Sequence, residues 1–134
     1  MKITFVDAGV LIEAARGIGY SARNAFEILD DKDRIFATSI YVKLEVLPKS
    51  VFYRYYQETR FYNEFFKNTR IWAIPTIELL ERAYDEAVMS GLSAIDAIHI
   101  VSAVSIGTDE FVTSEKISKP IHRTELISVV SIQS

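Results

Sequence analysis

The stretch Ser93-Ala94-Ile95-Asp96-Ala97-Ile98-His99-Ile100 predicts the start of a buried helix that carries a single acid. Most side chains from Ile95 to Val104 are apolar, and a helix that is apolar nearly all round is buried. Ser93 is a candidate N-cap, and Asp96 three residues later completes a pattern similar to a capping box. A buried carboxylate is costly unless it is paired or binds a cation. Asp96 is therefore either an acid satisfied by backbone N–H groups at the helix start or a metal ligand.

The composition limits the classes of function. The chain has 134 residues, of which 49% are hydrophobic and 25% charged, and this fits one globular domain spanning residues 1–134. Cysteine is absent from the sequence, which excludes disulfides, thiolate catalysis and cysteine-based zinc sites. Two histidines, His99 and His122, leave little room for a histidine-rich metal site.

The charge and the hydropathy pattern indicate the setting in which the protein acts. The net charge of −3 argues against a broad electrostatic grip on nucleic acid, but it allows a nuclease with a local basic rim. Asp7 interrupts the first apolar run, and nowhere do 18 apolar residues follow one another. We therefore expect a soluble, cytoplasmic protein without a membrane partner.

Short apolar runs rich in β-branched and aromatic residues alternate with helical patterns. Strands are predicted at residues 3–6, 35–38, 71–74, 110–113 and 126–132. Helices are predicted from residue 21 to about 31, from 39 to just before Pro48, over 50–68, from 76 to about 89, and over 94–105. This alternation predicts an α/β protein with a mainly parallel sheet that is covered on both faces.

Four acids are predicted at comparable places around this sheet. Asp7 follows the first strand, Glu45 lies on the helix after the second, Asp96 lies near the start of the helix before the fourth, and Glu115 follows the fourth. Such positions can converge at the carboxyl edge of a parallel sheet, where the sites of α/β proteins lie. Taken alone, Asp7 could equally be a helix cap or the end of a strand, and Glu45 a surface carboxylate.

Convergence of the four acids would have a chemical consequence. Carboxylates brought together repel one another unless a cation neutralises them, and oxygen ligands indicate Mg²⁺ or Mn²⁺. Such an ion orients a water molecule, lowers its pKa and stabilises a phosphodiester under attack. The four acids therefore indicate metal-dependent phosphodiester hydrolysis.

Four segments, taken in order, resemble the PIN-domain family, and in particular its small single-domain members related to VapC toxins. The segments are residues 7–12 (DAGVLI), 39–48 (SIYVKLEVLP), 92–99 (LSAIDAIH) and 107–116 (GTDEFVTSEK). The resemblance implies a three-layer α/β/α sandwich with a central, mainly parallel sheet of four to five strands. It also implies an Mg²⁺- or Mn²⁺-dependent endoribonuclease that hydrolyses RNA as the toxin of a toxin–antitoxin pair. An antitoxin protein partner and a homodimer are implied as well.

By this resemblance Asp7, Glu45 and Asp96 are the principal catalytic and metal-binding acids, with Glu115 as the fourth. The family has a Thr-x-Asp pattern at the fourth position, whereas this chain has Thr113-Ser114-Glu115. Asp109 competes for the same role, but it precedes the fourth strand and should lie at the opposite edge of the sheet.

Two further features concern the surroundings of the predicted site. Ala8 and Gly9 follow Asp7, where the family often has Ser, Thr or Asn just after the first Asp, so a polar partner of the ligands is missing. His99 lies three residues after Asp96 and is either a general acid or a satisfied buried imidazole. Lysines and arginines either line a substrate path or are solvated surface charges, namely Arg16, Lys43, Lys116 and Arg123.

Two other functions fit the same sequence. One is a PIN-like binding or scaffold module with weak or no nuclease activity, and the other is an unrelated α/β phosphohydrolase that acts on small phosphate esters. The 50–68 segment bears on this choice, because eight of the chain's aromatic residues fall within it. They form a core face, a base-stacking platform or a protein–protein surface, and their excess over what one helix face needs favours the protein–protein surface.

Overall fold

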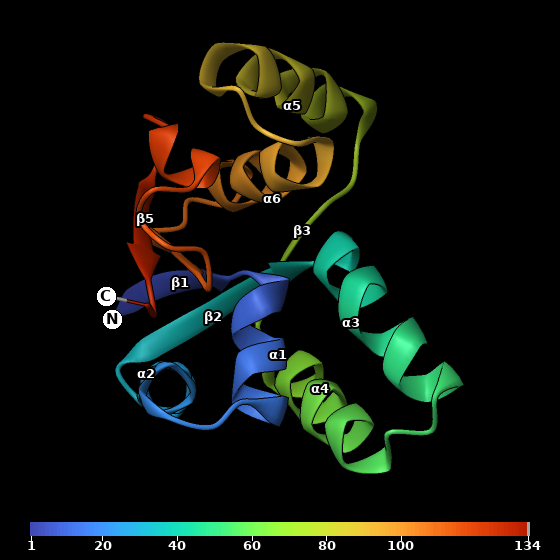
Figure 1. Cartoon of the computed structure of the whole chain (residues 1–134). Helices are drawn as coiled ribbons and strands as arrows, with labels where there is room; N and C mark the ends of the chain where they lie inside the picture. The colour runs from blue at the N-terminus through green and yellow to red at the C-terminus, as the bar shows by residue number, and fades with distance from the viewer. Residues whose placement is uncertain (134) are drawn as a thin grey trace.

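A five-stranded parallel sheet forms the centre of the computed structural model, which describes residues 1–133 (Figure 1). Its strands are β1 (Lys2–Val6), β2 (Arg34–Ser39), β3 (Ile71–Ala73), β4 (Glu110–Thr113) and β5 (Ser128–Ser131). They pair in the order β3-β2-β1-β4-β5, and every pair is parallel. Strand β4 is buried along its whole length and β1 over its last three residues, as a parallel sheet covered on both faces requires. The predicted strands are confirmed to within two residues at each end.

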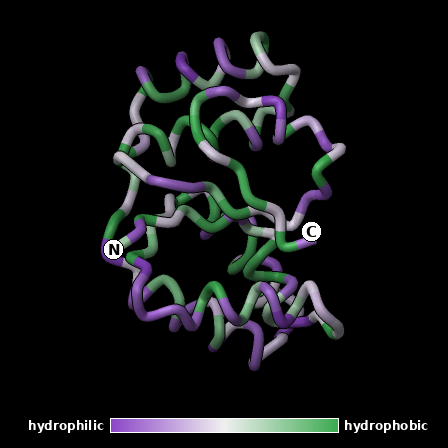
Figure 2. The backbone as a smooth tube through the Cα atoms, turned by 90° about the vertical axis from the view of Figure 1, so that its left-hand side faces the viewer, coloured by the Kyte–Doolittle hydropathy of each residue, from purple (hydrophilic) through white to green (hydrophobic). Residues whose placement is uncertain are grey.

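The helices form a layer on each face of the sheet (Figure 1). One layer holds α1 (Ala8–Arg16), α2 (Tyr20–Leu29), α3 (Ile40–Phe52) and α4 (Tyr56–Asn68). The other holds α5 (Ile77–Ser90) and α6 (Ala94–Ser105), with the short helix η1 (Pro120–Arg123) against α5. Figure 2 shows hydrophobic residues mainly along the strands, while the outer helices alternate between hydrophobic and hydrophilic residues. The predicted three-layer α/β/α sandwich is confirmed.

The predicted helix starts near Ser39, Thr76 and Ser93 are confirmed, because each of these side chains caps the helix that follows it. The three hydroxyls accept backbone N–H groups three residues later in the chain. Helix α1, by contrast, is absent from the predicted elements. It is only nine residues long, and Gly9 in its first turn lowers the helical propensity of the segment.

Helix α3 corrects one prediction, because it passes through Pro48 and ends at Phe52 rather than stopping before the proline. A proline inside a helix removes the N–H that would bond the carbonyl four residues earlier, here that of Leu44. Leu44 and Pro48 are both exposed, so this carbonyl lies on the side of the helix that faces water. Val46 and Leu47 pack into the core from the other side and hold the helix in place.

The single helix predicted over 50–68 is wrong, because the chain turns at residues 53–55. Arg54 adopts the left-handed conformation with φ 58°, and the Tyr55 N–H donates to the carbonyl of Ser50 at 2.9 Å. A left-handed residue other than glycine gives no clear signal in a sequence. Aromatic residues at and beside the turn are exposed, namely Phe52, Tyr53, Tyr55 and Tyr56, whereas Tyr62 and Phe66 further along α4 are buried.

Among residues 1–133, no single helix is both long enough and apolar enough to cross a membrane. Helices α5 and α6 meet the length and composition criteria only when taken together, and they are bent by 116° at the break between them.

An ion cluster lies at the amino edge of the sheet. Glu110, the first residue of β4, is buried, and its carboxylate contacts the guanidinium of Arg34. The same carboxylate accepts the hydroxyl of Thr4 at 3.1 Å, and the Lys2 ammonium lies 3.5 Å away. Cations from β1 and β2 therefore neutralise the buried acid of β4.

Replacing Arg34 by Met should destabilise the protein by about 2–3 kcal/mol, because Glu110 would stay buried without its main counter-ion. Urea denaturation measures this loss. The double variant Arg34→Met/Glu110→Gln should recover most of it, since no buried charge is then left unpaired. Equal stability of the single and double variants would contradict the role assigned to this ion pair.

Candidate metal centre

Asp7 connects the carboxyl end of β1 to the first turn of α1. Its backbone N–H donates to the carbonyl of Val112 on β4 at 2.9 Å, which fixes the residue at the edge of the sheet. Its side chain caps α1, because Oδ1 accepts the Ala8 N–H at 2.7 Å. Oδ2 accepts the hydroxyl of Thr113, the last residue of β4, at 3.0 Å. Asp7 is therefore both a helix cap and a buried acid at the carboxyl edge.

The surroundings of Asp7 change its acidity. Burial raises the pKa of its carboxyl group from 3.8 to about 6, while the charge of His99 and the hydrogen bond from Thr113 act in the opposite direction. The negative charges of Asp96 and Glu45 raise the pKa further. Both acids therefore lie close enough to repel a charge on Asp7, as expected if these residues converge.

His99 links Asp7 to Glu45. The imidazole lies on α6 and is 1% exposed, and its Nε2 contacts Oε1 of Glu45 on α3. The same nitrogen lies 3.9 Å from Oδ1 of Asp7. One ligand atom from each of these three side chains lies within 4.8 Å of the others, so they could share a metal ion. Nδ1 is buried and has no hydrogen-bond partner within residues 1–133, so only one of the two ring nitrogens is satisfied.

Asp96 and Glu115 lie around this group. Asp96 is in the first turn of α6, where its N–H donates to the Ser93 hydroxyl at 3.3 Å. Burial raises the pKa of the Asp96 carboxyl group, while its hydrogen bond with Ser93 and the charge of His99 lower it. The charges of Glu115 and Glu45 raise it again. Glu115 is exposed, and its N–H donates to the Thr113 hydroxyl at 3.1 Å.

Asp109 lies apart from these acids. Its carboxylate accepts the N–H of Ile3 at 2.8 Å, and its own N–H donates to the Ile3 carbonyl at 2.9 Å. Ile3 is near the start of β1, so Asp109 is at the amino edge of the sheet. The prediction that Asp109 lies opposite Glu115 is confirmed.

The two edges of the sheet differ in how their acids are neutralised. Glu110 at the amino edge has Arg34 and Lys2 beside it, whereas within residues 1–133 no lysine or arginine forms an ion pair with the four acids at the carboxyl edge. Those acids are Asp7, Glu45, Asp96 and Glu115. Carboxylates placed together with only a histidine beside them, and no lysine or arginine, suit a hard divalent ion such as Mg²⁺ or Mn²⁺. The donor set therefore fits the metal that the sequence implies.

Gly9 is required by a close approach between α1 and the segment after β4. A Cβ atom added at Gly9 would lie 2.0 Å from Oγ and 3.0 Å from Cβ of Ser114. Ser114 stands between Thr113, which bonds Asp7, and Glu115. The missing side chain at position 9 therefore brings the segment that carries the fourth acid close to α1.

Two side chains of this site, those of His99 and Thr113, are not among the four site residues predicted from the sequence. His99 has its only sequence signal in its place three residues after Asp96, which puts both on one flank of α6. Thr113 is part of the Thr113-Ser114-Glu115 motif, but the motif points to its acid rather than to its hydroxyl. Contacts between separate elements, here of α6 with α3 and of β4 with β1, give no local signal.

The fold is similar to that of solved bacterial and archaeal proteins, although no protein-family model and no curated protein sequence match the chain. A chain of VapBC2 from Rickettsia felis, bound to a DNA fragment from its promoter, aligns with a TM-score of 0.71 and 16% identity over 96% of this chain and 98% of that chain. A chain of FitAcB from Neisseria gonorrhoeae aligns with a TM-score of 0.64 and 13% identity over 97% of this chain and 98% of that chain. PAE2754 from Pyrobaculum aerophilum aligns with a TM-score of 0.60 and 19% identity over 96% of this chain and 84% of that chain.

These similarities define the class of fold. This chain, with its five-stranded parallel sheet between two helix layers, shares its fold with chains of VapBC2 and FitAcB over nearly its whole length. The PIN-like fold implied by the four sequence segments is therefore confirmed.

Asp7→Asn should stabilise the metal-free protein at pH 8. A carboxyl group whose pKa rises from 3.8 unfolded to about 6 folded favours the folded state fully below pH 3.8, and this contribution is lost as the pH rises through about 6. The corresponding free energy is up to about 3 kcal/mol. Asparagine keeps an oxygen that can accept from Ala8 but has no charge to desolvate.

Thermal melting in EDTA at pH 5 and pH 8 measures this effect. The melting temperature of the wild type should fall more between these two pH values than that of the Asp7→Asn variant. Parallel pH profiles of the two proteins would refute the assigned acidity.

Gly9→Ala should lower the affinity for Mn²⁺ about tenfold, because Ser114 must move and would displace Thr113 and Glu115. Isothermal titration of the folded variant with Mn²⁺ measures the affinity. The double variant Gly9→Ala/Ser114→Gly removes the clash and should restore much of the binding. A double variant as weak as Gly9→Ala would mean that the close approach does not position the site.

Proposed function

We propose that this protein is a divalent-metal-dependent endoribonuclease that hydrolyses RNA phosphodiester bonds as the toxin of a toxin–antitoxin pair. The observation that carries this proposal is the asymmetry between the two edges of the sheet. At the carboxyl edge, Asp7, Glu45 and His99 each offer a ligand atom within 4.8 Å of the others, and the charges of Glu45 and Glu115 act on Asp96. None of these acids has a lysine or arginine partner among the described residues, although the buried acid at the other edge has two. The likeness of the fold to VapBC2 and FitAcB supports the proposal.

Asp7, Glu45 and Asp96 would hold Mg²⁺ or Mn²⁺, with Glu115 as the outer carboxylate. When bound, the ion supplies Lewis-acid stabilisation of the phosphate and lowers the pKa of a water molecule. The products would be a 5′ phosphate and a free 3′ hydroxyl, because the attacking water adds its oxygen to phosphorus and the 3′ oxygen leaves with a proton.

The remaining polar groups would orient these acids. The Thr113 hydroxyl donates to Oδ2 of Asp7, and the Ala8 N–H donates to Oδ1, which fixes the plane of the carboxylate. His99 contacts Oε1 of Glu45, whose side chain is 38% exposed and can reach a substrate from the solvent side. Thr113 and His99 are therefore positioning residues in this proposal.

Apolar surface outside the site supports the partners that we propose. An apolar groove of about 500 Å³ runs along α3 and is lined mainly by Ile40, Leu44, Leu47, Pro48, Val51 and Phe52. A groove of this kind suits an amphipathic segment of an antitoxin. Exposed apolar residues on α5 would suit a homodimer, namely Ile77, Tyr84, Val88 and Met89. We further propose that residues 1–134 form one PIN-like domain and that this domain acts on RNA in the cytoplasm.

Asp96→Asn should reduce cleavage of a mixed RNA pool by at least about a hundredfold, because the variant loses a metal-binding charge without a change in size. Cleavage is followed on gels with purified protein in Mn²⁺, in Mg²⁺ and in EDTA. The matched control is Asp109→Asn, which makes the same change at the amino edge and should keep full activity. Full metal-dependent cleavage by Asp96→Asn would refute the assignment of the site.

The same samples distinguish the other functions. A binding module predicts no cleavage and no saturable Mn²⁺ site in the folded wild type. A phosphohydrolase acting on small esters predicts turnover of a model phosphate ester and no cleavage of RNA. Either result would replace the endoribonuclease proposal.

A further inference from the structure

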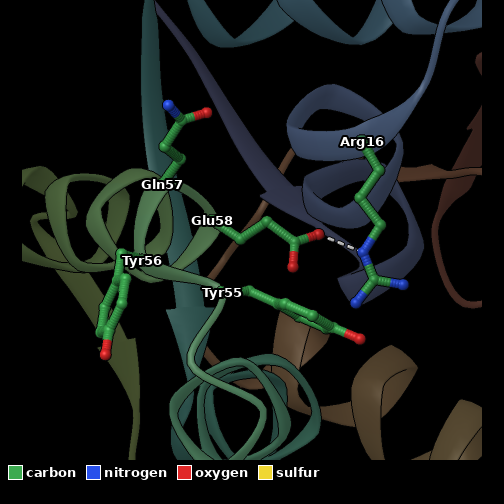
Figure 3. A pocket seen from close by; sticks show the side chains of 5 residues that line it. All are labelled: Arg16, Tyr55, Tyr56, Gln57 and Glu58. Carbon is green, nitrogen blue, oxygen red and sulfur yellow. Dashed lines mark hydrogen bonds and ion pairs between the residues drawn. The ribbon is translucent and has the colours of Figure 1, made fainter.

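A pocket of about 500 Å³ lies between the end of α1 and the start of α4 (Figure 3). Its lining comes from Arg16, the last residue of α1, and from the residues that open α4, namely Tyr55, Tyr56, Gln57 and Glu58. Neither the four acids nor His99 line this pocket. Its walls combine a cation, an acid, an amide and two aromatic rings, a mixture that is suited to a polar ligand with a flat face.

The arginine in this pocket is held in place by two neighbours. In Figure 3, the carboxylate of Glu58 and the ring of Tyr55 both point toward Arg16. Glu58 binds Nε of Arg16, and the guanidinium carbon lies 5.6 Å from the centroid of the Tyr55 ring. The Arg16 side chain is nevertheless 47% exposed. Within residues 1–133 its two terminal nitrogens have no hydrogen-bond partner, so they remain available as donors.

The aromatic side of the pocket is equally fixed. Tyr55 follows the turn in which its N–H donates to the Ser50 carbonyl, and its ring stacks on Tyr53 at a centroid distance of 5.7 Å. The Thr59 hydroxyl donates to the Ser50 hydroxyl at 2.9 Å and ties α4 to the end of α3. Tyr56, by contrast, is 74% exposed and has no ring contact among the described residues. Its ring face can therefore accept a flat ligand.

We propose that this pocket binds a short stretch of the single-stranded RNA substrate, with a phosphate on Arg16 and a neighbouring base on the exposed face of Tyr56, whose ring points away from Arg16 in Figure 3. The inference rests on the proposed function and adds a substrate-binding subsite to it. An arginine held at Nε presents two parallel N–H donors that match two phosphate oxygens. A neighbouring aromatic ring is what single-strand binding sites use to stack a base of any sequence.

The position of the pocket relative to the acids fits this role. Asp7 caps the first turn of α1 and Arg16 ends the same helix, so the helix separates them by about 13 Å along its axis. An extended strand of RNA covers this distance with a few nucleotides. Because the net charge is −3, binding cannot rely on a broad positive surface, and a local site with an oriented arginine is the efficient alternative.

Binding of a fluorescein-labelled single-stranded RNA to the Asp96→Asn protein tests this subsite without cleavage. Fluorescence anisotropy in EDTA, at several salt concentrations, compares the parent with Arg16→Met. We expect about tenfold weaker binding and a salt slope smaller by about 0.7, the value for one lost phosphate contact. Tyr56→Ala should weaken binding about fivefold without changing the slope.

The matched control is Arg23→Met, which removes the same charge from an exposed position on α2 and should change binding less than twofold. Arg16→Lys serves as a second variant that keeps the charge and the ion pair with Glu58. It should keep the salt slope of the parent and bind more weakly, because it lacks the planar fork. Urea denaturation confirms that each variant is folded.

Equal effects of Arg16→Met and Arg23→Met, or an unchanged salt slope in Arg16→Met, would overturn the subsite. The proposed function fails independently: RNA bound through Arg16 but never cleaved by the wild type in Mn²⁺ would leave the subsite standing without the nuclease. If Arg16→Met changed neither the KM for RNA cleavage nor the affinity for RNA, the nuclease would stand without the subsite.

Discussion

The arrangement of the structure depends on the burial of one carboxylate, that of Asp7, between β1 and α1. Burial raises its pKa to about 6, so an ionised Asp7 costs free energy in the folded protein. The nearest groups offset only part of this cost. The charge of His99 and the hydrogen bonds from Thr113 and the Ala8 N–H favour the ionised carboxylate, while Asp96 and Glu45 add repulsion. A fold that keeps such a residue at the centre of its sheet edge is under strain that a bound cation would relieve.

The elements around Asp7 hold it from several directions at once. Strand β4 provides the Val112 carbonyl and the Thr113 hydroxyl, and helix α6 provides the imidazole of His99. These contacts join both helix layers to the same sheet edge, since α6 lies on one face and α1 on the other (Figure 1). The geometry of the acids is therefore set by the packing of the whole sandwich rather than by a mobile loop. Such preorganisation is what a metal site needs to bind its ion without reorganising.

The strands and the helix caps could be predicted from the sequence because each has a local signal, whereas the assignment of the four acids to a metal site stays a prediction. Hydrophobic runs predict the buried strands, and Ser39, Thr76 and Ser93 predict the helices that they cap. The two wrong helix predictions arise where the sequence gives no local signal of what the fold does. Pro48 stays inside α3 because burial of the other helix face outweighs a missing hydrogen bond, and the left-handed Arg54 breaks the 50–68 segment without a glycine. The contact of His99 with Glu45 and the fit of Ser114 against Gly9 join elements far apart in the chain.

The placement of a few cations explains how an acidic chain could still suit the nucleic-acid substrate that we propose. Within residues 1–133, Arg34 and Lys2 neutralise Glu110, and Arg16 is oriented by Glu58. A cation fixed by an acid adds little to the net charge, yet it presents its remaining donors in a defined direction. Recognition built from a few such groups depends less on ionic strength than a diffuse positive surface does, because fewer phosphates are neutralised and fewer counterions are released in total. Helix α1 has an acid without a lysine or arginine partner at its N-cap and an oriented arginine as its last residue, and so fixes the spacing between them.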